Sequence, residues 1–176
     1  MQLFQAFIET PVATMRAISV GDALCSLEFF RTGRMARLDA RLARWFKDAE
    51  LVEATTPPIE QAREWLRRYF AGEAADISHL TLEMRGAPFE VRVWEALRRI
   101  PAGTTTTYGA IARELGSPDA SRAVGMANGA NPIAIIVPCH RVIGSNGTLT
   151  GYGGGLETKA WLLDHERRWA KEPALF

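Results

Sequence analysis

The sequence predicts an α+β fold in two parts, and three observations lead to this prediction. Short apolar or β-branched runs at residues 3–9 and 14–30, broken by Pro11 and Gly21, indicate antiparallel strands. Two stretches with helical spacing follow them, and a pair of short helices in the second half has helix-turn-helix spacing. A polar stretch near residues 76–86 separates the parts, so we assign one domain to residues 1–80 and another to residues 86–176.

The first part contains two expected helices. From Arg34 to Lys47, apolar residues recur at helical spacing beside a stripe of arginines, which we interpret as a solvated face. Thr55-Thr56-Pro57-Pro58 is a turn and helix-start signal. Residues 59–70 then read as a second helix, which ends at Ala71-Gly72.

The second part begins with an amphipathic helix over residues 89–100, stopped by Pro101-Ala102-Gly103. Four threonines then favour an extended segment. Residues 108–115 and 119–128 read as helices joined by Gly116-Ser117-Pro118, and residues 156–169 read as a terminal helix. The apolar run Ile133–Val137 is expected to form a buried strand.

The composition limits the protein class. A chain of 176 residues that is 47% hydrophobic can bury a sizeable core, and without a leader pattern or a membrane-length apolar window we expect a cytoplasmic protein with no membrane partner. The net charge of +1 argues neither for nor against nucleic acid. The only cysteines, Cys25 and Cys139, lack metal-ligand spacing, so we expect reduced thiols without a disulfide or zinc cluster.

The segment Pro138-Cys139-His140-Arg141-Val142 directly follows the expected buried strand and is the best candidate for chemistry. A thiol attacks only as its thiolate, and imidazole is the side chain best suited to handle the proton near neutral pH. Neighbours on a strand point to opposite faces, so Cys139 and His140 should not pair directly unless the chain turns or a water bridges them. A role for Cys139 as a small buried hydrophobic residue stays open.

The helix expected at residues 119–128 is unusual for its small side chains, which would let it approach another surface closely. These residues are Ala120, Ala123, Gly125, Ala127, Gly129 and Ala130. Tight packing inside the core is the alternative. Arg122 is the only long charged group among them, which favours an outward-facing helix.

In this order the motifs resemble the O6-alkylguanine-DNA alkyltransferases, or methylated-DNA–protein-cysteine methyltransferases, of the bacterial stand-alone type. The resemblance runs from about Gly86 to Glu166 and is carried by Tyr108-Gly109, Ser121-Arg122-Ala123-Val124-Gly125, Asn131-Pro132, the Pro-Cys-His-Arg-Val segment, Gly151-Tyr152-Gly153-Gly154 and Lys159-Ala160-Trp161-Leu162-Leu163. The N-terminal third of the chain matches the family only in outline and in Tyr69-Phe70-Ala71-Gly72.

The resemblance implies a small ribonuclease H-like α/β N-terminal domain followed by a winged-helix-like C-terminal domain that binds DNA. It also implies nucleotide flipping and one irreversible transfer of a methyl or alkyl group from O6 of guanine to Cys139, so that each molecule reacts once. O4 of alkylated thymine stays open as a second position from which the alkyl group could be taken. The implied partner is double-stranded DNA containing O6-alkylguanine, no cofactor is implied, and we expect a monomer in solution.

The resemblance also implies roles for individual residues. Cys139 is the nucleophile, His140 takes its proton through a water, and Glu166 orients the imidazole. Asn131 ties the recognition helix to this network, and Tyr108 promotes rotation of the nucleotide and reaches the guanine edge. For Glu166, an exposed acid paired with a neighbouring base is the alternative.

The implied contacts with DNA centre on Arg122, which would fill the space of the flipped nucleotide in the minor groove. The other expected DNA-contacting residues are Tyr108, Ala123, Gly125, Ala127, Asn128 and Gly129. The implied guanine pocket uses the carbonyls of Cys139 and Val142 and the amide of Gly153, with Tyr152 as a wall or, alternatively, as a packed loop aromatic.

The sequence argues against a zinc site and against two other functions. Some relatives bind zinc in the N-terminal domain, but only Cys25 and His79 are plausible ligands there, so we expect no metal and a core role for Cys25. A lesion sensor like the alkyltransferase-like proteins would lack the acceptor thiol, which Cys139 supplies. A thiol hydrolase would turn over, but no nucleophile-elbow pattern is present.

Overall fold

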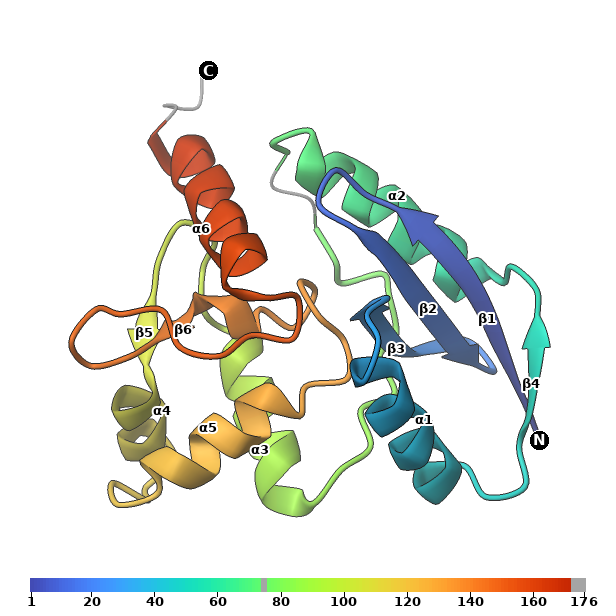
Figure 1. The fold of residues 1–176 in the computed structure, drawn as a ribbon, viewed down its shortest axis with the longest axis horizontal. Helices are drawn as coiled ribbons and strands as arrows, with labels where there is room; N and C mark the ends of the chain where they lie inside the picture. The colour runs from blue at the N-terminus through green and yellow to red at the C-terminus, as the bar shows by residue number, and fades with distance from the viewer. Residues whose placement is uncertain (74–75, 172–176) are drawn as a thin grey trace. The chain divides into compact units, whose positions relative to one another are not determined.

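The structure, a computed structural model, describes residues 1–73 and 76–171 and divides the chain into two compact units (Figure 1). The first unit comprises Met1–Arg85 together with Pro132–Ala134, and the second comprises Gly86–Asn131 and Ile135–Phe176. Both units combine helices with strands, so the expected α+β class is confirmed. The short segment Pro132–Ala134 joins the first unit although it lies far along the chain.

The first unit is built on a four-stranded sheet with the order β3-β2-β1-β4. Strands β1 (Gln2–Glu9), β2 (Thr14–Val20) and β3 (Ala23–Phe29) pair antiparallel, as their runs predict. Strand β4 (Glu50–Glu53) pairs parallel with the start of β1 and was not expected from the sequence. It has four residues, of which only one is even half-buried, so it carries too little hydrophobic pattern to be recognised.

Helix α1 (Arg34–Trp45) packs its apolar stripe into the core of the first unit, where Leu38 and Leu42 are buried with residues of the sheet. The arginine stripe is a solvated face only in part. Arg37 and Arg44 are exposed, but Arg34 Nη2 lies 2.7 Å from Oε2 of the buried Glu28. One arginine of the stripe is therefore an ion-pair partner for a carboxylate inside the sheet.

Helix α2 (Pro57–Phe70) begins at the two prolines, whose missing N–H groups cost nothing in a first helical turn. It contacts β1, β2 and β3, and its buried face includes Ile59, Leu66 and Tyr69. The two expected helices of the first half are thus present, with ends within a few residues of those predicted.

The second unit begins with helix α3 (Pro88–Arg98), whose Trp94 is fully buried. A Cβ added to Gly86 would lie 2.5 Å from Cη2 of Trp94, so only glycine fits beside this ring. The indole Nε1 donates to the carbonyl of Ala127 at 2.8 Å. Trp94 therefore fixes one turn of the helix that contains Ala127.

Helices α4 (Tyr108–Glu114) and α5 (Ser121–Gly129) form the expected helix pair. Thr107 caps α4 by accepting a hydrogen bond from the amide of Ala110 at 3.1 Å. Gly116, with a φ of 76°, follows the end of α4 in a conformation that favours glycine. A small parallel pair, β5 (Thr106–Thr107) with β6 (Val142–Ile143), and helix α6 (Leu156–Lys171) complete the second unit.

The apolar run Ile133–Val137 is not the strand that the sequence predicted. Its start pairs with β3, because Leu27 N donates to Pro132 O at 2.9 Å and Ala134 N donates to Leu27 O at 2.7 Å. Ile135 then adopts a φ of 68°, which is rare for a β-branched residue, and the chain turns. All five side chains are buried, so the pattern predicted burial correctly and the backbone conformation wrongly.

Among the described residues, every helix is too short or too polar to cross a bilayer. Within the same residues, His, Cys, Asp and Glu side chains form no group of three or more that could hold a metal ion.

Candidate active site

Cys139 and His140 lie in a single 3₁₀ turn, η1 (Cys139–Arg141), rather than at the end of a strand. Cys139 N donates to Val137 O at 2.8 Å and Arg141 N donates to Pro138 O at 3.0 Å, and these bonds wind the chain at Cys139. Cys139 is 5% exposed and His140 is fully buried. The two residues therefore do not end a strand; the chain turns here, which is the condition left open for a direct pair, and the absence of such a pair stays a prediction.

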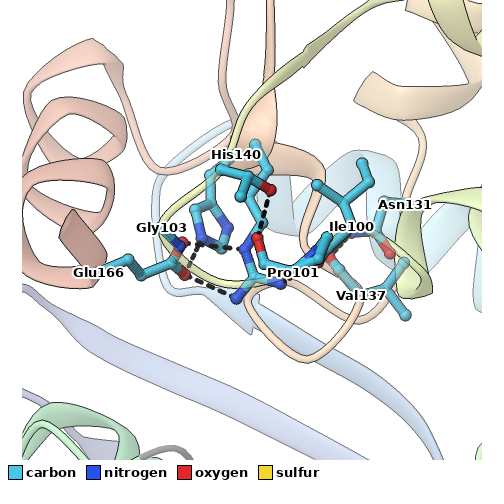
Figure 2. A network of polar contacts seen from close by, with 9 residues as sticks. Ile100, Pro101, Gly103, Asn131, Val137, His140 and Glu166 are labelled. Atoms are coloured by element: carbon cyan, nitrogen blue, oxygen red, sulfur yellow. Dashed lines mark hydrogen bonds and ion pairs between the residues drawn. The ribbon is translucent and has the colours of Figure 1, made fainter. Parts of the chain in front are cut away.

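His140 belongs to a buried network of charged groups, which Figure 2 shows from close by. Its Nε2 lies 2.6 Å from Oε1 of Glu166, which is fully buried on α6. The guanidinium of Arg141 bonds both oxygens of the same carboxylate, at 2.9 and 2.8 Å, and donates to Ile100 O at 2.6 Å. Glu166 is therefore not an exposed acid, and the alternative drawn from the sequence is wrong.

Burial and the charges in this network together set the protonation state of the imidazole. Burial alone would raise the pKa of Glu166, but its bond to His140 and the charge of Arg141 outweigh burial and hold the pKa well below its usual range. Burial lowers the pKa of His140. A carboxylate can only accept, so Nε2 of the neutral ring carries the proton and Nδ1 carries the lone pair. Nδ1 is buried and has no hydrogen-bond partner within the described residues.

Lys159 is a buried cation in this part of the second unit that the sequence analysis did not single out. It is fully buried on α6, and its Nζ donates to Val142 O at 2.7 Å and to Thr150 O at 3.1 Å. Burial lowers its pKa, and the charge of Cys139 partly offsets that effect. The signal was available, because Lys159 and Glu166 share a helical stripe with Leu162 and Leu163.

Two asparagine side-chain amides hold the backbone at Cys139 and just before it. Asn131 Nδ2 donates to Val137 O at 2.8 Å (Figure 2), and the role expected for Asn131 stays a prediction. Asn128 Nδ2 donates to Cys139 O at 3.3 Å. Both side chains are buried.

The outward face of α5 differs from the set of residues expected to contact DNA. Ala127 and Asn128 are buried, so their side chains do not lie on the outer surface. Arg122, Ala123 and Gly129 are exposed, and Gly125 is half-buried. Met126, which was not in the expected set, is 78% exposed. Its exposure could have been predicted from the sequence, because Met126 lies one helical turn after Arg122 and so on the same face of the helix.

The remaining expected residues lie within the second unit. The Tyr108 hydroxyl is 2.5 Å from Oγ1 of Thr150, and the ring lies 3.8 Å from the point where a Cβ on Gly125 would stand. Tyr152 is half-buried, with its ring centroid 6.4 Å from that of His140. Gly153 follows it in the loop before α6, half-buried. Val142 is buried, and its carbonyl is the one that Lys159 holds.

The arrangement suits thiol chemistry. The thiol of Cys139 is buried, and the charge of this residue acts on the pKa of the buried Lys159. The imidazole of the next residue, His140, has one nitrogen fixed by a carboxylate and a lone pair on the other. These groups can accept the thiol proton and stabilise the thiolate without a metal ion.

A family model described as "6-O-methylguanine DNA methyltransferase, DNA binding domain" matches residues 88–168. A methylated-DNA–protein-cysteine methyltransferase of Salmonella typhimurium is 56% identical over 117 residues, which are 66% of this chain and 67% of that protein. The protein of the same name from Haemophilus influenzae is 38% identical over 165 residues, covering 94% of this chain and 87% of its own. A crystal structure of Mycobacterium tuberculosis OGT in complex with DNA superposes with a TM-score of 0.78 at 40% identity, covering 99% of this chain and 96% of that chain.

Proposed function

The chain belongs to the methylated-DNA–protein-cysteine methyltransferase family, and we propose that it repairs DNA by moving an alkyl group from O6 of guanine to Cys139. The observation that carries this proposal is the buried Cys139 thiol next to the His140–Glu166–Arg141 network. No cofactor is needed, because the thiol is both nucleophile and final acceptor.

The reaction is a displacement at the alkyl carbon. A Cys139 S–C bond forms while the C–O6 bond breaks, and the bonding electrons pass to the purine. The thiol proton moves through a water to Nδ1 of His140, whose Nε2–H stays bonded to Glu166. The purine takes up one proton from water on its ring while the imidazolium returns the thiol proton to water, so the overall proton count balances. The thioether that forms is a poor leaving group, and each molecule therefore reacts once.

Glu166 and Arg141 contribute by keeping the imidazole in one tautomer and one orientation. A carboxylate held by both a guanidinium and an imidazole has no freedom to rotate. The hydrogen bond from Nε2 to this carboxylate therefore keeps the imidazole ring in one orientation. General-base assistance of this type contributes roughly 10²- to 10⁴-fold to rates.

The proposal also includes a finer description of the fold of each unit. A ribonuclease H-like topology for the first unit is supported by three antiparallel strands with a fourth, β4, parallel to β1. A winged-helix-like second unit is supported by the α4–α5 pair together with the small β5–β6 pairing.

Duplex DNA containing O6-alkylguanine is the proposed partner. We place α5 in the minor groove, because Arg122 and exposed small residues let it approach closely, and Arg122 would occupy the space left by the flipped nucleotide. Tyr108, at the start of α4, would promote rotation of that nucleotide. Arg122→Ala is then expected to slow repair of the duplex without slowing the reaction with the free base.

The guanine pocket is proposed to use the carbonyls of Cys139 and Val142, the amide of Gly153, and the ring of Tyr152. Each carbonyl has two lone pairs, so Val142 O can hold Lys159 and still accept from the guanine amino group. Cys139 O already accepts from Asn128 Nδ2 and from the amide of Val142, so it would share one lone pair between one of these donors and the guanine. Lys159 thereby becomes a positioning residue for the pocket.

The direct test is to mix the protein with a duplex containing O6-methylguanine and to analyse the products by intact-mass and peptide mass spectrometry. We expect one methyl group per molecule, located on Cys139, and no turnover beyond one equivalent. Repair of the duplex with an unmodified Cys139, or equal repair by Cys139→Ser, would refute the proposal.

A further inference from the structure

Asn128 of α5 was expected to contact DNA, yet its side chain is 4% exposed and bonds the backbone of the nucleophile. We propose that Asn128 is a positioning residue, which connects the recognition helix to the carbonyl of Cys139 and fixes the thiol for attack. The inference rests on the proposed function and goes beyond it, because it assigns a role in reactivity to a residue of the DNA-binding helix.

The helix turn that bears Asn128 is rigidly placed. The carbonyl of Ala127 accepts a hydrogen bond from the buried indole of Trp94 at 2.8 Å, and Trp94 has no exposed surface. An amide that projects from such a turn has little freedom to move. The hydrogen bond to Cys139 O therefore transmits the position of α5 to the η1 turn.

The carbonyl of Cys139 accepts two hydrogen bonds, one from Asn128 Nδ2 at 3.3 Å and one from the backbone amide of Val142. Asn131, which follows the end of α5, donates to Val137 O. Two side-chain amides therefore hold the backbone carbonyls of Val137 and Cys139. Fixing these carbonyls fixes the peptide planes around Cys139. The direction of its Cα–Cβ bond, and so the line along which sulfur approaches carbon, follows from those planes.

The cost of burying Asn128 argues that it is not there for stability. A carbonyl can only accept, so the NH₂ group must face Cys139, which leaves Oδ1 buried without a hydrogen-bond partner in the described residues. A buried acceptor of this kind destabilises the folded state, whereas a leucine of similar volume would not. A polar residue retained at such a cost is expected where geometry matters for reactivity.

The test uses two variants and the free base O6-benzylguanine, which needs neither DNA docking nor nucleotide flipping. Asn128→Leu removes the donor and keeps the volume. We expect it to react with the free base about tenfold more slowly than the parent, to melt at no lower temperature, and to bind undamaged duplex with unchanged affinity.

Asn128→Asp separates donation from packing. The ionised carboxylate can only accept and repels Cys139 O, so the rate relative to the parent is expected to fall by about tenfold or more at neutral pH. A protonated carboxyl can donate, and burial favours that form. The deficit relative to the parent should therefore shrink as the pH falls, whereas a packing role would give a pH-independent ratio.

Asn146→Asp is the matched control, because Asn146 is exposed and uses its Oδ1 as an acceptor from Thr148, which an aspartate preserves. It is expected to keep the parental rate at each pH. A parental free-base rate for both Asn128 variants, or a loss of duplex affinity without a change in that rate, would overturn the inference. Failure of the parent itself to become alkylated on Cys139 would instead overturn the proposed function.

Discussion

The two cysteines of this chain are both buried, yet their surroundings differ in kind. Cys25, on β3, is 1% exposed within a core cluster that includes Ile18 and Leu42. Its thiol donates to Ile18 O at 3.4 Å, and burial raises its pKa to about 12. A thiol in such surroundings stays protonated at any physiological pH and is chemically inert.

Cys139 is nearly as buried, at 5%, but it is joined to a buried charged network through its chain neighbours His140 and Arg141. Lys159 is close enough for the charge of Cys139 to affect its pKa, and His140 lies next in the chain with an unprotonated Nδ1. Burial alone therefore makes a thiol unreactive, whereas burial beside a cation and a base can make it a nucleophile.

Substitution of Cys139 should lower the rate of alkyl transfer, whereas substitution of Cys25 should lower only the stability of the fold. Cys139→Ser is expected to slow alkyl transfer from O6-methylguanine duplex by more than about a thousandfold, because a hydroxyl is a far weaker nucleophile than a thiolate. Cys25→Ala should stay within about twofold of the parental rate while losing roughly 1 to 2 kcal/mol of stability. Single-turnover kinetics and chemical unfolding measure the two quantities. A slow Cys25→Ala variant that is fully folded would remove the contrast.

The base beside Cys139 has no counterpart at Cys25. Glu166→Gln keeps the shape of the side chain but frees the imidazole from a charged partner, so transfer is expected to slow by about a hundredfold. Single-turnover rates in excess duplex will measure this. Glu157→Gln, at an exposed position of the same helix, is the control and should react at the parental rate. Equal rates for the two variants would exclude the relay through His140.

The buried cation is the second difference between the cysteines. Lys159→Met removes a positive charge beside Cys139 and leaves the carbonyls of Val142 and Thr150 without their donor. We expect the pH profile of Cys139 labelling by iodoacetamide to move to higher pH and the rate at neutral pH to fall by about tenfold. Lys47→Met, at an exposed site, should leave the profile in place. An unmoved profile in Lys159→Met would show that this ammonium group does not tune the thiol.

The smallest predicted effect concerns stability. Because burial lowers the pKa of His140 in the folded state, the unfolded chain binds the proton more readily, and stability should fall as the pH drops below about 6.5. The slope is at most about 1.4 kcal/mol per pH unit for one proton. The low pKa of Glu166 acts in the same direction but only in a more acidic window. Urea unfolding should show the loss near pH 6 in the parent and in His79→Gln, and a flatter profile in His140→Gln.

Much of the fold followed from local patterns, and the errors have physical causes. Helices with a clear apolar stripe, such as α1 and α3, were predicted within a few residues. Strand β4 was missed because its four residues are mostly exposed. The run Ile133–Val137 was predicted as a strand, but pairing with β3 holds only its first residues and Ile135 then turns the chain. Hydrophobicity reports burial and does not report backbone torsion.

The sequence pattern and the resemblance together identified Cys139, His140, Asn131 and Glu166 as candidates. They could not predict what depends on side-chain direction. Arg141 was quoted only within a motif, and its bidentate contact with Glu166 becomes visible only in three dimensions. Asn128 was assigned to the wrong side of α5, because small neighbours on both faces leave a short helix without a strong periodic signal.

The pairing of Pro132–Ala134 with β3 also affects how the protein can be made. The first unit is not encoded by one continuous stretch of codons, since part of its sheet edge comes from a segment translated after α5. A nascent chain that has emerged only as far as Arg85 presents Leu27 with its backbone amide and carbonyl unsatisfied on that side. Such open edges promote association between chains, so this unit becomes safe from aggregation only when translation has passed Ala134.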